Sequence, residues 1–173
     1  YYSRWLAPSL AYAQAALKLD PKDASALELR GTVFYYQKVF NLVGGPAAST
    51  LVADAAGDLR AAVEADPHRA SAGALLSHLL MRESQPAEAK LAALHAYEAD
   101  PYLANASSLL WRLYASSLDL EDGLEATRWC EEGFRRFPKE PEFTECQITQ
   151  HALPGQRPAV PRMWRLLEEN VRL

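Results

Sequence analysis

The side chains that most often carry enzyme chemistry are few in this chain and follow no catalytic spacing. Cys146 and His151 are five residues apart, which on a helix is not one face, so they do not suggest a nucleophile and its base. The histidines have no HExxH or CxxC context, and a metal site would lack its usual spacing; they are His68, His78, His95 and His151.

Other catalytic signatures are absent as well. Adjacent acid pairs such as Glu131 and Glu132 diverge by about 100° on a helix and are better read as surface charge than as a dyad. There is no Gly-rich phosphate loop, no GxSxG elbow and no set of kinase motifs. The sequence therefore predicts no catalytic residue, no metal and no cofactor in this segment.

The two cysteines do not make a disulfide framework. Cys130 is predicted to be a buried small apolar residue. Free thiols favour a reducing compartment, and we expect a cytoplasmic location. The chain opens on Tyr1 rather than Met, so we also expect a piece of a longer protein, and this leaves the compartment open.

Composition then indicates which elements must position the polar side chains. Among 173 residues there are 30 Ala and 26 Leu but only 7 Val and 1 Ile, which favours helices over strands. The 18 basic and 22 acidic residues are mixed along the chain, which disfavours nucleic acid as a partner. No apolar run is long enough for a membrane span.

Helix-ending prolines recur along the chain. Proline cannot continue a helix and disfavours the helical conformation in the residue before it. Three boundaries read Asp-Pro and a fourth reads Phe-Pro, with spacings of 46, 34 and 37 residues, at Pro21, Pro67, Pro101 and Pro138.

Small and large residues recur at fixed distances from these prolines. Five residues before each proline the side chain is small, and thirteen after the first three it is large. Small residues let two helices approach closely, while large ones pack into a partner helix. The two sets are Ala16, Ala62, Ala96 and Gly133, and Phe34, Leu80 and Tyr114.

This pattern resembles the tetratricopeptide repeat (TPR), a helix–turn–helix unit of about 34 residues. The resemblance implies an all-α, right-handed superhelical solenoid of about nine helices with a C-terminal capping helix. We expect the second helix of a truncated repeat in 1–20, and TPR-like repeats in 21–67, 68–101 and 102–138. The first of these repeats carries an insertion at 41–50, the third has three extra residues, and 139–173 holds a degenerate helix, a linker and the cap.

The resemblance also implies a binding groove lined by the first helix of each pair. Its groove positions fall on one helical face in each repeat. They combine small residues, an amide and positive charge, which suits an extended peptide with an acidic side chain or free carboxylate. The expected groove residues are Glu28, Thr32, Tyr35, Tyr36, Ser71, His78, Arg82, Asn105, Ser108 and Arg112, with Ser25, Ala74, Met81, Ala115 and Ser116 at further groove positions.

Three functional questions stay open in the sequence. Glu28 and Thr32 contradict the Lys and Asn pair of chaperone-binding TPR domains, so that subclass is rejected. The insertion at 41–50 reads as a surface loop or as a flap beside the groove, with Ser49 and Thr50 capping the next helix. The C-terminal helix, with Trp164, Leu167 and Val171 on one face, reads as a cap or as a surface that docks on another copy.

Short stretches also resemble TPR regions that follow bacterial Ser/Thr protein kinase domains; they are 27–32, 89–93, 135–138 and 143–147. That resemblance implies the sensor or scaffold part of a larger regulator, with no kinase residue carried over. The sequence thus predicts a protein-interaction scaffold of unknown oligomeric state. The alternatives are a self-assembly module or, in third place, a small-ligand domain with a pocket around His78 and Arg112.

Overall fold

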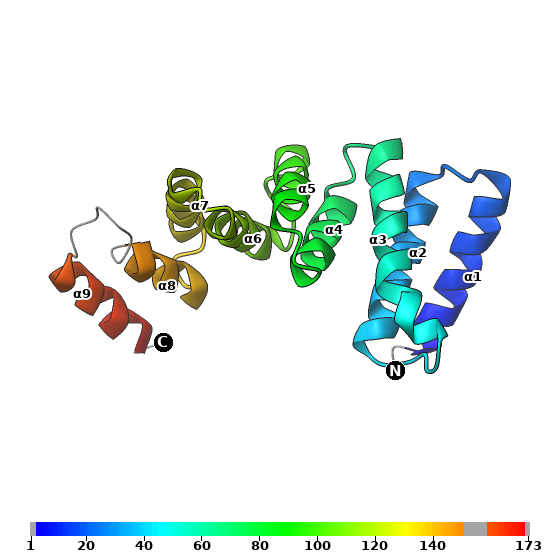
Figure 1. The fold of residues 1–173 in the computed structure, drawn as a ribbon, viewed down its shortest axis with the longest axis horizontal. Coiled ribbons are helices and arrows are strands. Elements are labelled where there is room, and N and C mark those ends of the chain that lie inside the picture. The colour runs from blue at the N-terminus through cyan, green and yellow to red at the C-terminus, as the bar shows by residue number, and fades with distance from the viewer. Residues whose placement is uncertain (1–2, 151–158, 172–173) are drawn as a thin grey trace. The chain divides into compact units, whose positions relative to one another are not determined.

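The computed structural model describes residues 3–150 and 159–171, and within these ranges the chain forms nine α-helices and no strand (Figure 1). The prediction of an all-α fold is confirmed. The helices are α1 (Ser3–Leu19), α2 (Ala24–Val39), α3 (Ala47–Ala65), α4 (Ala70–Arg82), α5 (Pro86–Ala99), α6 (Ala106–Asp119), α7 (Gly123–Arg136), α8 (Pro141–Gln150) and α9 (Val160–Val171). The predicted linker at 153–158 and His151 lie outside the described residues.

The chain divides into two compact units. The first spans Tyr1–Leu103, and in it each of α1 to α4 packs on the helix that follows it in sequence. Its core is built from Leu and Ala of α2 to α5, including Leu27, Leu59, Leu76 and Leu80. The second spans Ala104–Leu173, and in it α6, α7, α8 and α9 pack in the same sequential way.

Each Asp-Pro boundary is built as the same turn. The backbone N–H of Asp66 donates to the carbonyl of Ala62, the small residue five positions before Pro67. The Asp66 carboxylate then accepts from the backbone N–H of His68, at 3.1 Å. Asp20 and Asp100 repeat both bonds, so the Asp-Pro signal works by ending one helix and ordering the turn to the next.

The turns inside the helix pairs share a second structure. The residue after α2, α4 and α6 closes each helix, and the next residue takes a left-handed conformation, at Asn41 (φ 50°), Ser84 (φ 57°) and Glu121 (φ 57°). The following N–H bonds back to a carbonyl five residues earlier, as from Gln85 to Leu80, which satisfies the last carbonyls of the helix. No glycine marks these turns in the sequence.

The recurring small residues are where helices touch. Ala55, Ala89 and Ala126, which stand twelve before their prolines, are fully buried. A Cβ on Gly31 would lie 3.0 Å from the carbonyl oxygen of Ala55, so α2 and α3 approach at van der Waals contact there. The Ala content therefore reflects close helix packing.

The insertion is partly helical. The loop after α2 ends at Pro46, and α3 is 19 residues long where α5 and α7 have 14. Ser49 and Thr50, expected to cap the next helix, lie instead in the first turn of α3, and Pro46 occupies the N-cap position without a side-chain bond. Four of the ten residues at 41–50, Ala47 to Thr50, thus belong to α3 and lengthen it at its start.

The two cysteines are bonded to each other, so the expectation of free thiols is wrong. The Cys130–Cys146 disulfide joins α7 to α8 with 6.0 Å between the Cα atoms, and both residues are fully buried. Cys130 is buried as predicted, but as half of a cross-link. A separation of 16 residues is not a known spacing for a disulfide. The sequence therefore does not predict the bond, which depends on the packing of α8 against α7.

The C-terminal helix α9 packs on α8 through a different side chain from the one expected. Leu166 is buried, whereas Trp164 and Leu167 are 62% and 41% exposed. Arg162 adds a hydrogen bond of 3.0 Å to Gln147 of α8. The face of α9 that contains Trp164 therefore does not cover α8.

Candidate partner-binding face

The ten expected groove residues are all at least partly exposed, but they are divided between the units. Seven belong to the first unit and lie on α2 and α4. Asn105, Ser108 and Arg112 belong to the second unit, on or beside α6. Ala74 and Ser116, placed at groove positions by spacing, are fully buried. Spacing from the proline thus predicts exposed positions on these helices. It fails at two small residues, which are buried.

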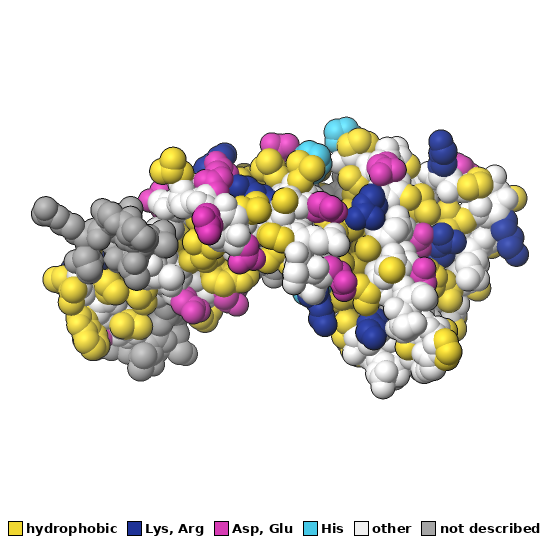
Figure 2. Space-filling model, in the orientation of Figure 1, with side chains coloured by type: hydrophobic (Ala, Val, Ile, Leu, Met, Phe, Trp, Pro, Cys, Tyr) yellow, Lys and Arg dark blue, Asp and Glu magenta, His cyan; other side chains and the backbone are white. Residues whose placement is uncertain are grey.

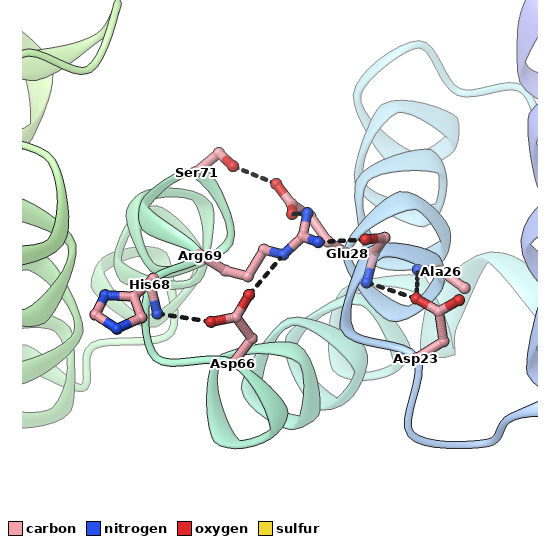
Figure 3. Close-up of polar contacts among 8 residues, drawn as sticks. Asp23, Ala26, Glu28, Asp66, His68, Arg69 and Ser71 are labelled. Atoms are coloured by element: carbon pink, nitrogen blue, oxygen red, sulfur yellow. Dashed lines mark hydrogen bonds and ion pairs between the residues drawn. The ribbon is translucent and has the colours of Figure 1, made fainter.

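Glu28 is held in a polar network at the start of α4 (Figure 3). Its carboxylate accepts from Arg69 at 3.3 Å and from the hydroxyl of Ser71. Arg69 also bonds Asp66 at 3.2 Å and the hydroxyl of Ser25. Two of the expected groove residues, Glu28 and Ser71, therefore bind one another and join α2 to α4.

Aromatic side chains connect the same two helices further along. The Tyr35 hydroxyl lies 3.3 Å from Nε2 of His78, and the two rings meet edge to face. Tyr36 stacks on Phe40, with 5.8 Å between ring centroids, and both rings are more than a third exposed. This end of the face offers aromatic surface with polar tips.

A cleft opens beside these aromatic residues, at the ends of α2 and α4 and along α3. Its volume is about 740 Å³. Val52, Leu79 and Leu80 supply apolar lining, and Tyr35 and Arg82 are the two expected groove residues that line it. The remaining residues of the lining are Lys38, Val39, Ser49, Ala53, Ala56, Arg60, Glu83 and Gln85.

The cleft is cationic. Lys38, Arg60 and Arg82 line it against one acid, Glu83. Arg60 is paired with Glu88 at 3.5 Å, whereas Lys38 and Arg82 have no ion pair within the described ranges. Their positive charge is available to a ligand, so the cleft favours a carboxylate over an ammonium group.

Sequence reasoning missed Lys38 and the α3 residues of this cleft. The groove positions implied by the repeat lie only on the first helix of each pair, and Lys38 falls two residues beyond the last of them, Tyr36. Val52 and Ala53 lie on α3, the second helix of its pair, and Ser49 lines the cleft from the part of α3 that exceeds the 14 residues of α5 and α7. An exposed Lys in the last turn of α2 was the available signal.

An ion pair joins α2 to the helix that follows it, α3. Arg30 of α2 donates two hydrogen bonds of 2.7 Å to Asp58 of α3. Asp58 is buried, and its hydrogen bond raises the pKa of the Arg30 guanidinium. Arg30, with a side chain 30% exposed, and Asp58 thus neutralise each other and join α2 to α3.

Other kinds of site find no support in the described part of the chain. No cluster of three or more His, Cys, Asp or Glu side chains there could hold a metal ion. None of its helices is long and apolar enough to cross a bilayer. On the face shown in Figure 2, acidic and basic side chains are interleaved with apolar ones rather than gathered by sign.

The fold is shared with several solved structures. MamA superposes with a TM-score of 0.73 at 17% identity, covering 94% of this chain and 87% of that one. YrrB, described as a TPR protein with an unusual peptide-binding site, gives a TM-score of 0.75 at 16% identity, covering 99% and 79%. The Pseudomonas aeruginosa protein pilF gives 0.65 at 18% identity, covering 97% and 75%.

No protein-family model matches the chain, and no curated protein matches it either. The structural neighbours are TPR proteins, so the chain has a TPR-type fold. Identities below a fifth show the fold alone.

Proposed function

We propose that this chain is a protein-interaction scaffold, and that its first unit takes an extended acidic segment of a partner along α2 and α4. The observation that carries the proposal is the cationic cleft, in which Lys38 and Arg82 stand over apolar lining without an ion-pair partner in the described residues. A peptide that combines an apolar side chain with a carboxylate could contact the apolar lining and pair with these two cations.

The polar network at the other end of the face fits the same ligand. Arg69 and Ser71 compensate the Glu28 carboxylate, which lowers its repulsion of an acidic peptide. Thr32, Tyr36 and His78 follow the network residues of their helices in sequence, and Tyr35 lines the cleft. Together they support a path for an extended chain with an anionic end near Arg82.

The second unit has its own expected residues for a partner. Asn105 stands at the N-cap position of α6 with no side-chain cap bond, and its amide is exposed. Ser108 is exposed and Arg112 is half-buried on the same helix. We propose that these three form a separate contact for a partner on the second unit.

The experiment is a peptide array that presents extended sequences with alternating apolar and acidic residues, and the same sequences with Lys in place of the acids. We expect the acidic set alone to be retained, with binding that weakens as salt rises. The Lys38→Glu/Arg82→Glu variant should lose about tenfold or more in affinity. Equal retention of the basic set would contradict the proposal.

A matched control has the same change in charge away from the cleft. Lys22 and Lys139 are exposed lysines in turns, so Lys22→Glu/Lys139→Glu alters net charge equally. We expect it to retain the acidic peptides. If both double variants lose binding to the same extent, net charge explains the result and the cleft does not.

The wider setting rests on sequence resemblance and on chemistry. The likeness to regions behind bacterial Ser/Thr kinase domains supports a role in which this segment selects partners for such an enzyme, and the full-length gene product would test it. The disulfide removes the argument for a reducing compartment, because such bonds persist more readily in oxidising ones. A cytoplasmic location therefore has no support from the cysteines.

A further inference from the structure

The cations of the cleft stand at two levels, and the first is fixed by the register between α2 and α4. The two residue pairs that bridge these helices are each 43 apart in sequence, so the helices run side by side in the same direction; the pairs are Glu28 with Ser71 and Tyr35 with His78. One turn further on, the same register places Arg82 opposite Val39, the neighbour of Lys38. Lys38 and Arg82 both line the cleft, so they stand at one level on opposite sides of it.

Arg60 of α3 supplies the second level. The chain turns back after α2, so α3 runs antiparallel to it, with Gly31 set against Ala55 and Leu59 (Figure 1). Counted from this contact, Lys38 lies level with the first turn of α3, and Arg60 is about ten residues further along, or roughly 15 Å. Long helical side chains lean toward the start of their helix, so the guanidinium group lies somewhat nearer to the first level than this.

Apolar side chains lie between the two levels. Val52 and Ala56 follow the first turn of α3 on the way to Arg60, and Leu79 and Leu80 add to the lining from α4. An extended peptide advances about 3.3 Å per residue and points alternate side chains to the same side, so a step of four residues spans about 13 Å. Two acids four residues apart therefore match the two levels, and the residue midway between them meets the apolar side chains.

From this match we propose that the cleft selects a segment with the pattern acid-x-apolar-x-acid, in which x is any residue. One carboxylate binds between Lys38 and Arg82, and the other binds Arg60. This selectivity rests on the proposed function of the cleft and adds the spacing of the acids to it.

Arg60 already has an acid as its partner, and the peptide can displace it. Nη2 of Arg60 lies 3.5 Å from Oε2 of Glu88, and the two side chains are 47% and 62% exposed. Exposed ion pairs of this kind contribute little to stability, so a carboxylate of the peptide can replace Glu88 at little cost. Glu88 thus competes with the second acid of the peptide, and removal of its charge should tighten binding.

The test is fluorescence anisotropy of the 173-residue chain with labelled peptides that carry two Glu around a Leu. The two Glu are set two, four, six or nine residues apart in a Gly-Ser background, and a further peptide has one Glu. We expect the spacing of four to bind about tenfold more tightly than the other spacings and the one-acid peptide. The Arg60→Gln variant should bind the spacing-four peptide no better than the one-acid peptide, whereas Glu88→Gln should bind it more tightly than the parent.

The Arg128→Gln variant is the matched control, because Arg128 of α7 is also exposed and paired with one acid, Glu125, at 3.2 Å. It should leave every affinity unchanged. Equal affinity at all spacings, with binding still lost in the Lys38→Glu/Arg82→Glu variant, overturns the inference and leaves the proposed acidic-peptide site standing. An optimum at nine overturns it as well, because that spacing fits a helical segment. If no acidic peptide binds, the proposed function fails and the inference fails with it.

Discussion

At the residue scale, close packing of the repeat requires a position without a side chain, Gly133. Gly133 stands where the other repeats have Ala, five residues before the proline, and the ring of Phe143 fills the space a side chain would need. Phe143 is 1% exposed and stacks near Phe137, with 6.2 Å between ring centroids. The sequence predicted a small residue here but not that even a methyl group is excluded.

We expect Gly133→Ala to lower the free energy of unfolding by about 2–3 kcal/mol, because the methyl group overlaps the Phe143 ring and forces the core of α7 and α8 apart. Chemical denaturation monitored by circular dichroism measures this change. Gly57 is the control. It lies at an exposed position of α3, and no atom lies within 4 Å of the Cβ that Ala would add there. There the gain in helix propensity should stabilise by about 1 kcal/mol. A change in the free energy of unfolding with the same sign at both sites would contradict the packing of Phe143 against Gly133.

The exposure of the expected groove residues could be predicted only in part, and the reason is geometric. Spacing from a proline identifies a face within about one residue, or 100° of rotation. An error of this size is enough to separate a buried position from an exposed one. Ala74 and Ser116 are buried, whereas Tyr36 and Arg82 are exposed. Side-chain partners such as Arg69 for Glu28 depend on tertiary contacts between α2 and α4, which no local pattern encodes.

At the element scale, helix ends were predictable where proline sets them. Pro86 and Pro141 open α5 and α8, and the Asp-Pro boundaries close α1, α3 and α5. The turns with left-handed Ser84 and Glu121 were not predictable, because the usual glycine signal is absent. For the residues that extend α3, the sequence pattern predicts a loop, because Gly and Pro at 44–46 dominate it.

The α7–α8 pair depends on its cross-link, which closes a loop of 16 residues. Constraining a loop of this length is worth about 3 kcal/mol, so the Cys130→Ala/Cys146→Ala variant should unfold at distinctly lower denaturant concentration than the parent. Treatment of the parent with reductant should reproduce the loss, only slowly, since both sulfurs are buried.

Two measurements check this prediction. Intact mass under non-reducing conditions should be two hydrogens below the dithiol mass, and thiol titration should find no reactive cysteine before reduction. An unchanged unfolding midpoint after complete reduction would contradict a stabilising bond.

At the scale of the whole molecule, helices pack on their sequence neighbours within each unit, and each unit has a core of its own. Leu59, Leu76 and Leu80 belong to the first, and Leu110, Trp129 and Phe143 to the second. The one-dimensional repeat was predictable, because near-neighbour contacts leave a period in the sequence. The division after Leu103 was not, because the boundary at Pro101 reads like the others.

Separate cores predict separate responses to damage. In a nearest-neighbour stack, stability is a sum of local terms, so a lesion in α7 or α8 should weaken its own unit most. We expect Gly133→Ala, or reduction of the disulfide, to accelerate amide exchange in α6 to α8 while α2 to α5 keep the protection of the parent. Hydrogen exchange followed by mass spectrometry resolves the two sets. If protection falls equally along the whole chain, the molecule unfolds as one cooperative body, and the local lesion acts globally.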